Sequence, residues 1–175
     1  MISDTTIRNE VRQRAEFKCE FCGISETDSG GELTIDHFRP ISKDGNDNLN
    51  NLIYCCIRCN QYKLDYWPID SDDSKLWNPR IESFGEHFLK LDDGTLYPLT
   101  STGSFTLKRL RLNRPPLVAN RLRKLKNIKD IRLLKQYHNL SVLLEKLLFQ
   151  QSELVKDQQR LLKDQYKLLN LLMNK

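Results

Sequence analysis

Residues 32–66 read ELTIDHFRPISKDGNDNLNNLIYCCIRCNQYKLDY, and this segment says more about the fold than any other part of the 175-residue chain. Apolar and polar residues alternate over residues 32–37, which is typical of a half-buried strand. A polar loop with a glycine covers residues 43–48, and the apolar run at residues 52–55 predicts a second strand. Residues 57–66 favour a helix. The order strand, loop, strand, helix predicts a small α+β unit.

Four cysteines bracket this segment as two CxxC pairs, Cys19–Cys22 and Cys56–Cys59, with 33 residues between the pairs. A CxxC turn places two sulfurs on one metal, and tetrahedral zinc takes four thiolates. We therefore predict a structural Zn²⁺ site; the alternatives are two unconnected buried pairs or a redox motif. Cys55 is left over, either replacing Cys56 at a poorer spacing or lying buried on a strand. Four protein ligands leave no open position, so any catalysis must use other residues.

The residues between and after the cysteine pairs form an ordered series. It consists of a DH dipeptide, a loop, an Asn-Leu pair before the second CxxC, and an Asn and a Lys after it. In this chain these positions are Asp36-His37, Asn51-Leu52, Asn60 and Lys63. The series, over residues 15–66, resembles the HNH (ββα-metal) endonuclease family, in its stand-alone bacterial type with a zinc knuckle. The third letter of the family name is Asn here rather than His.

The resemblance implies a role for each of these residues. His37 would be the general base that deprotonates a water, and Asn51 would orient the loop that carries it. Asp36 and Asn60 would hold one divalent cation, Mg²⁺ or Mn²⁺. The chemistry of the side chains agrees. An imidazole that titrates at about pH 6.5 suits general-base work at neutral pH, and carboxylate and amide oxygens suit a hard cation.

Three cations near these residues are candidate nucleic-acid contacts. Lys63 lies one turn beyond Asn60 on the expected helix, and the resemblance implies that it touches phosphate. Arg58 and Arg39 are further candidates. The alternative for Lys63 and Arg58 is a solvated position on the helix.

The catalytic residues also have structural alternatives. Asp36 could be a solvent-facing acid in a turn, and Asn60 could cap a helix after the second cysteine pair. Asn48 and Asn50 are as plausible in a turn as Asn51, which is favoured because it stands five residues before the second cysteine pair.

Residues 68–107 carry fewer signals. Asp92-Asp93-Gly94 predicts a hairpin between residues 88–91 and 95–97. A looser resemblance to the extension of stand-alone HNH proteins covers this region. His87 could approach the catalytic residues, or it could be a hydrogen-bonded histidine packed beside Trp77 and Phe88.

Charge is strongly partitioned along the chain, and it suggests three segments. Residues 1–107, the expected nuclease domain with a small β extension, carry 11 Lys/Arg and 18 Asp/Glu, a net of −7. Residues 108–135 carry 11 Lys/Arg and one acid, a net of +10, and residues 136–175 carry six bases and four acids, a net of +2. The basic segment predicts binding to DNA phosphates. The residues singled out there are Arg121, Arg123, Lys124 and Lys126.

The chain from Pro115 to Lys175 contains no glycine and no proline after Pro116, which predicts helix, with a possible break near residues 138–139. Leucines recur every seven residues, which favours a coiled coil over residues 136–175 that joins copies of the chain or binds a partner protein. These leucines are Leu140, Leu147, Leu154, Leu161 and Leu168. Residues between them widen the apolar stripe, so a bundle of more than two helices is also possible. The remaining alternative is an intramolecular hairpin with residues 117–137.

Together these features predict an α+β HNH endonuclease that hydrolyses DNA, followed by a long helical region. No apolar run approaches the roughly 20 residues of a membrane span, and the polar N-terminus suggests no signal peptide, so we expect a cytoplasmic protein with reduced cysteines. A tail that binds another protein would fit an effector in bacterial defence against foreign DNA. The alternatives are a non-catalytic zinc-stabilised DNA-binding module and an RNA-directed nuclease or toxin.

Overall fold

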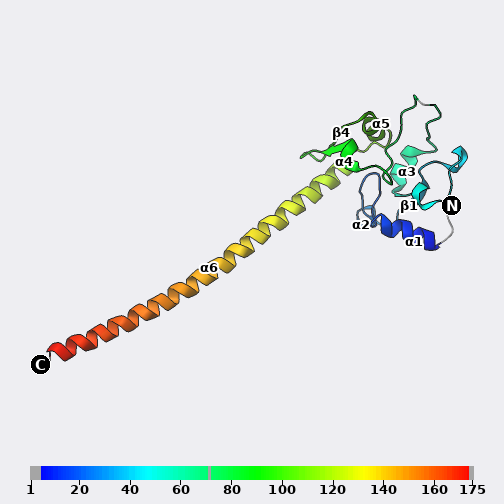
Figure 1. Ribbon diagram of the computed structural model, residues 1–175. Coiled ribbons are helices and arrows are strands. Elements are labelled where there is room, and N and C mark those ends of the chain that lie inside the picture. The colour runs from blue at the N-terminus through cyan, green and yellow to red at the C-terminus, as the bar shows by residue number, and fades with distance from the viewer. Residues whose placement is uncertain (1–4, 71, 174–175) are drawn as a thin grey trace. The chain divides into compact units, whose positions relative to one another are not determined.

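The computed structural model describes residues 5–70 and 72–173, and it divides into two compact units, Met1–Leu125 and Lys126–Lys175 (Figure 1). The first unit contains two small antiparallel sheets and the short helices, and the second is the C-terminal part of helix α6. None of the helices in the described ranges is both long enough and apolar enough to cross a membrane.

The predicted strand–loop–strand–helix order is confirmed. Strands β1 (Thr34–His37) and β2 (Leu52–Cys55) pair antiparallel, and helix α3 (Ile57–Lys63) follows directly. All four residues of β2 are buried, whereas those of β1 are half-buried. Helix α3 is shorter than the predicted range of 57–66, because Leu64 adopts a positive φ of 54° that ends the helix.

Helix α1 (Thr5–Arg14) packs on β2, and the first cysteine pair follows it in the chain. Its apolar face is anchored by Val11, which is fully buried. The Arg14 guanidinium donates to the backbone carbonyls of Leu49 at 2.7 Å and Leu52 at 2.6 Å. Arg14 therefore ties the end of α1 to the beginning of β2.

A partly buried polar cluster connects β2 to helix α2 (Glu26–Ser29). The Tyr54 hydroxyl donates to Glu26 Oε1 at 2.5 Å and accepts from the Leu33 backbone N–H at 2.9 Å. Glu26 also accepts two hydrogen bonds from the Arg12 guanidinium, at 2.6 and 2.7 Å. Because every partner is satisfied, this cluster can lie inside the fold without a large desolvation cost.

The second sheet confirms the predicted hairpin. Strands β3 (Phe88–Lys90) and β4 (Leu96–Pro98) pair antiparallel between helices α4 (Phe84–His87) and α5 (Ser101–Arg109). Gly94 in the turn has a φ of 79°, and a Cβ there would lie 2.8 Å from the Val118 carbonyl oxygen. Only glycine fits this turn without strain.

The extension is held to the ββα part by a buried acid. Glu20 lies inside the first CxxC pair, and its Oε2 accepts from the Tyr54 backbone N–H at 2.7 Å. Its Oε1 lies 2.5 Å from Arg80 Nη1. Trp77 packs on the rings of Phe84 and Phe88, at centroid distances of 5.6 and 5.4 Å. The extension is therefore part of the same unit as the knuckle.

Helix α6 (Pro115–Met173) is a single continuous helix with no break near residues 138–139. The alternative of an intramolecular hairpin with residues 117–137 is therefore wrong. In the second unit the leucines of the seven-residue repeat are 61–64 % exposed.

Candidate functional site

The four cysteines of the two CxxC pairs form one cluster, in which all sulfur atoms lie within 4.8 Å of one another. Cys19 and Cys22 lie on the turn after α1, whereas Cys56 caps the N-terminus of α3 and Cys59 lies in its first turn. Four thiolates at this separation match the ligand set of a tetrahedral structural zinc. The four cysteines are positioned to form a zinc site.

Arg114 supports this cluster from the turn before α6. Its Nη2 lies 3.8 Å from the sulfurs of both Cys56 and Cys59. A zinc ion with four thiolates carries a net charge of −2, so a guanidinium beside two of the sulfurs offsets part of the cost of burying that charge.

Cys55 lies outside the cluster, as its interpretation as a buried strand residue predicted. It is fully buried on β2, and burial raises the pKa of its thiol above the usual value. A protonated thiol is a poor metal ligand.

Asp36 and Lys63 form a buried ion pair at the junction of β1 and α3. Asp36 Oδ2 lies 2.8 Å from Lys63 Nζ, and the Lys63 side chain is fully buried. The same ammonium donates to the His37 backbone carbonyl at 2.7 Å. The charge of Lys63 is therefore enclosed by the end of β1, and its phosphate contact stays a prediction.

The ion pair leaves one carboxylate oxygen of Asp36 for another ligand. Oδ2 is buried against Lys63, whereas the side chain as a whole is 18 % exposed. Asn60 precedes Lys63 by three residues on α3, so it lies on the same side of that helix. A carboxylate and an amide oxygen in this setting fit Mg²⁺ or Mn²⁺, which take oxygen ligands and keep several waters.

His37 ends β1, and its imidazole is held by an acid from the following loop. His37 Nε2 lies 2.7 Å from Asp47 Oδ1. With Nε2–H donating to that carboxylate, Nδ1 is the nitrogen that can accept a proton. Asp47 was not predicted, because its loop also contains Asp44 and no spacing rule distinguishes the two.

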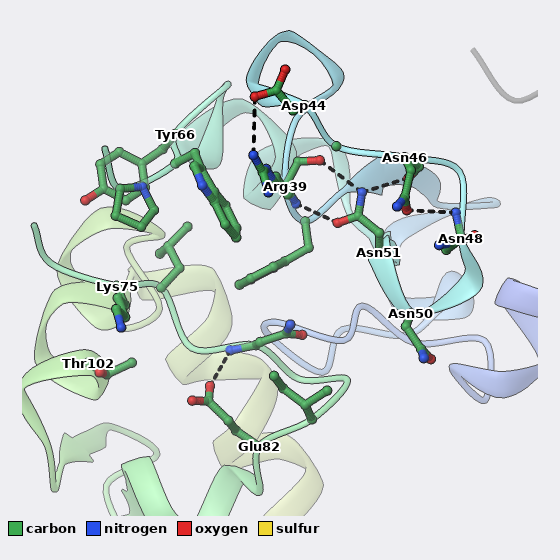
Figure 2. A pocket seen from close by; sticks show the side chains of 17 residues that line it. Arg39, Asp44, Asn46, Asn48, Asn50, Asn51, Tyr66, Lys75, Glu82 and Thr102 are labelled. Atoms are coloured by element: carbon green, nitrogen blue, oxygen red, sulfur yellow. Dashed lines mark hydrogen bonds and ion pairs between the residues drawn. The ribbon is translucent and has the colours of Figure 1, made fainter. Parts of the chain in front are cut away.

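Asn51 organises the loop between β1 and β2, which contains the short 3₁₀ helices η1 (Ile41–Lys43) and η2 (Leu49–Asn51). Its Oδ1 accepts from the Arg39 backbone N–H at 2.8 Å, and its Nδ2 donates to the carbonyls of Arg39 at 3.0 Å and Asn46 at 2.8 Å (Figure 2). Gly45 allows this closure, because a Cβ there would lie 1.9 Å from the Arg39 carbonyl oxygen.

Several predicted nucleic-acid contacts are used inside the first unit instead. Arg121 is half-buried and donates to the Gly94 carbonyl at 2.6 Å and the Leu112 carbonyl at 2.7 Å. Burial also lowers the pKa of Arg121. These contacts give Arg121 a structural role, and its nucleic-acid contact stays a prediction.

Arg123 and Lys124 both pair with Asp28, at 2.5 and 3.0 Å. The hydrogen bond from Ser25 is the largest cause that holds the pKa of the Asp28 carboxyl below its usual value, and the bond from Lys124 is the next largest. The charges of Arg123 and Lys124 are thus partly neutralised within the unit.

The remaining predicted contacts stay exposed or half-exposed. Arg58 is exposed on α3 and donates to Gln61 at 3.2 Å, and Lys126 is exposed on α6. Arg39 is half-exposed, with its guanidinium 5.3 Å from the Trp67 ring centroid and 3.4 Å from Asp44.

His87 belongs to the second sheet region. Its Nδ1 lies 2.7 Å from Thr100 Oγ1, and its ring centroid lies 6.3 Å from that of Phe88. These contacts fit the interpretation of a hydrogen-bonded, packed histidine.

Comparison with known proteins identifies one region. Residues 19–65 match the family model described as HNH endonuclease, and this match covers the cysteine cluster, β1, β2 and α3. It spans well under half of the chain. Among curated proteins and among solved structures, nothing matches the chain.

Proposed function

We propose that this chain, in which residues 19–65 form an HNH endonuclease domain, is a metal-dependent nuclease that hydrolyses DNA phosphodiester bonds. The observation that carries the proposal is the position of Asp36 and His37 at the end of β1, next to the face of α3 that carries Asn60. Such a junction would bring a base and oxygen ligands to one place.

His37 is the general base in this proposal. Asp47 fixes the imidazole through Nε2, so that Nδ1 takes the proton of the attacking water. Asn51 holds the loop that carries Asp47, through its bonds to the backbone of Arg39 and Asn46.

Asp36 Oδ1 and Asn60 are the proposed holders of a divalent cation. When bound, Mg²⁺ or Mn²⁺ would stabilise charge on the scissile phosphate and on the leaving oxygen. Lys63 has a structural role in this proposal, because its ion pair holds the Asp36 carboxylate in place before the cation binds.

Plasmid cleavage with Mg²⁺ or Mn²⁺ tests the proposal. His37→Ala should reduce the rate by about 10²–10⁴-fold, the range that general bases contribute. His138→Ala is the matched control, because His138 is exposed on α6, and it should cut like the wild type. Equal cutting by His37→Ala would overturn the catalytic assignment. Binding without cutting by the wild type would favour the non-catalytic alternative, and cutting of RNA alone would favour the RNA-directed one.

The basic part of α6 is the proposed DNA tether. With Arg121, Arg123 and Lys124 engaged in the first unit, the exposed cations further along the helix carry this role. These are Lys126, Lys129, Arg132 and Lys135. Their contribution is electrostatic, so binding should weaken steeply with salt.

The second unit is proposed to assemble through its apolar stripe. On a helix with 3.6 residues per turn, Gln158 lies between the leucine row of Leu154 and the parallel row of Val155 and Leu162. Gln151 and Gln165 repeat this position one heptad away. A stripe this wide exceeds the seam of a two-stranded coil, so we propose copies of this chain in a bundle of more than two helices. We also propose that the assembled protein acts as an effector in defence against foreign DNA.

A further inference from the structure

An open cavity of about 620 Å³ lies beside the loop that follows His37. Phe38 and Arg39, the next two residues of the chain, line it. Figure 2 shows Asn50 and Asn51 on one side of the cavity, and Tyr66 and Lys75 on the other. The cavity therefore begins one residue away from the proposed general base.

One wall of this loop cavity is aromatic. Phe38 and Trp67 meet edge to face with ring centroids 5.9 Å apart, and both rings are half-exposed. The Arg39 guanidinium lies over the Trp67 ring at 5.3 Å. Tyr66 is held in turn by Arg109, whose guanidinium lies 4.5 Å from the ring centroid. These side chains are fixed by their neighbours, and a fixed aromatic wall suits stacking of a flat group.

The opposite wall carries amide groups with unused hydrogen-bonding capacity. The Asn51 side chain uses both its amide oxygen and its amide nitrogen in hydrogen bonds to the loop backbone. Asn50 lines the cavity and makes no side-chain hydrogen bond to the rest of residues 5–70 and 72–173. An amide offers a donor and an acceptor side by side, which matches the edge of a nucleobase.

The charges lining the cavity are mixed. Lys75 is exposed and forms no ion pair within the described chain, whereas Arg39 lies 3.4 Å from Asp44. Glu82 also lines the cavity and accepts from the Asn78 backbone N–H at 2.7 Å. A site for a free multivalent anion would not contain two carboxylates. The chemistry fits a group with a planar, hydrogen-bonding part and a single flanking negative charge.

We propose that the loop cavity holds one unpaired base of the nucleic-acid substrate, next to the phosphodiester bond presented to His37. This inference rests on the proposed nuclease function. A base inside a duplex must leave its stack to reach such a cavity, so single-stranded or distorted substrate is preferred over regular duplex.

Binding measured in a His37→Ala background, which keeps the substrate uncut, tests the proposal. Three probes of equal length are compared by fluorescence anisotropy: a single-stranded DNA oligonucleotide, its duplex, and an oligomer with the same backbone and no bases. Trp67→Ala should weaken single-strand binding about tenfold, which corresponds to about 1.4 kcal/mol of lost stacking. Binding of the duplex and of the base-free oligomer should change by less than about twofold. A single-stranded RNA of the same sequence shows whether the cavity discriminates between the two sugars.

Control variants separate a base site from general damage. Trp67→Phe keeps a ring and should retain most of the affinity, but the quenching of tryptophan emission on binding should disappear. Tyr97→Ala removes an aromatic side chain that is 58 % exposed on β4, and it should have no effect. Asn50→Ala should weaken single-strand binding without affecting the base-free oligomer.

Equal losses for all probes, or no loss for the single strand, would overturn the proposal. The two experiments test the base site and the nuclease function separately. A chain that cuts plasmid but binds single strands independently of Trp67 loses only the base site. A chain that shows the Trp67 dependence but cuts nothing loses only the nuclease assignment.

Discussion

The imidazole Nε2 of His37 lies 2.7 Å from Oδ1 of Asp47, ten residues further along the chain. The Asp47 side chain is 70 % exposed, whereas that of His37 is 21 % exposed. The acid therefore reaches inward from a loop to fix the orientation of a more enclosed ring. In the proposed mechanism, this contact makes Asp47 a positioning residue.

Replacing Asp47 tests that assignment. Asp47→Ala frees the imidazole to rotate, so we expect kcat for DNA cleavage to fall about tenfold or more, with KM changed little. Asp47→Glu should restore part of the rate. Asp92→Ala is the control, because Asp92 is exposed in the turn between β3 and β4, outside this loop. A rise in KM at constant kcat would instead point to a substrate contact.

Breaking the buried pair of Asp36 and Lys63 should strongly destabilise the fold. Lys63→Met leaves the Asp36 carboxylate facing a buried space without its cation, and we expect the free energy of unfolding to fall by about 3–5 kcal/mol. Urea denaturation measures this, with the exposed Lys126→Met as control. The double variant Asp36→Leu/Lys63→Met should lose less than the sum of its single variants. Strict additivity would show that the pair is not coupled.

Metal content should distinguish Cys55 from the cluster. Cys59→Ser should reduce bound zinc and lower the melting temperature, since structural zinc supplies folding energy. Cys55→Ala should keep the zinc content of the wild type, because its thiol lies outside the sulfur cluster. Elemental analysis of the purified proteins decides the matter, and zinc loss in Cys55→Ala would mean that the ligand set is wrong.

Acid stability should depend on Glu26. Its pKa is lowered from 4.5 to about 2, mainly by hydrogen bonds from Arg12 and further by the Tyr54 hydroxyl. Because the folded pKa lies below the unfolded one, the ionised group stabilises the fold above about pH 4.5. That stability is lost as the pH falls from there toward about 2. Glu26→Gln should therefore destabilise the chain at neutral pH and flatten the loss of stability in this pH range.

The control for this titration is Glu10→Gln, on the exposed face of α1. The melting temperature of Glu10→Gln, measured across the pH range, should follow the same curve as that of the wild type. If Glu26→Gln kept the full slope, other carboxyl groups would carry the acid transition.

Assembly through the second unit predicts a molar mass above that of one 20.6 kDa chain. Leu154→Glu with Leu161→Glu should reduce it toward a single chain, because both side chains lie on the apolar stripe. Lys156→Glu with Lys163→Glu changes charge on the other side of the helix and is the control. Light scattering of the full chain measures the mass. A single-chain mass for the wild type would exclude self-assembly and leave a different partner protein.

The sequence predicted what depends on local spacing. Two CxxC turns, an alternating strand and an Asp-Gly turn each act within a few residues, so the ββα order and the β3–β4 hairpin followed directly from them. The burial of Lys63 did not follow. Helical spacing gives the side of α3 on which Lys63 lies, but not that the end of β1 covers it.

The contacts that the basic segment makes within the chain could not be predicted for a related reason. Net charge along the chain is visible in the sequence, but the partners of a charge can be far away. Arg123 pairs with Asp28, 95 residues earlier, and Arg121 bonds to carbonyl groups of β-turn and loop backbone. No local pattern reveals such neighbours, and the same holds for Asp47 beside His37.

The tight approach at Gly45 has a consequence for sequence variation. The Arg39 carbonyl occupies the place where any side chain at position 45 would begin. In a library of random variants selected for a folded, active protein, this position should accept glycine alone. Its neighbour Asp44, with a φ of 58°, should also accept asparagine and glycine, which tolerate that backbone. The loop around the proposed catalytic residues is thus constrained by its main chain at both positions, by a close approach at Gly45 and by a positive φ at Asp44.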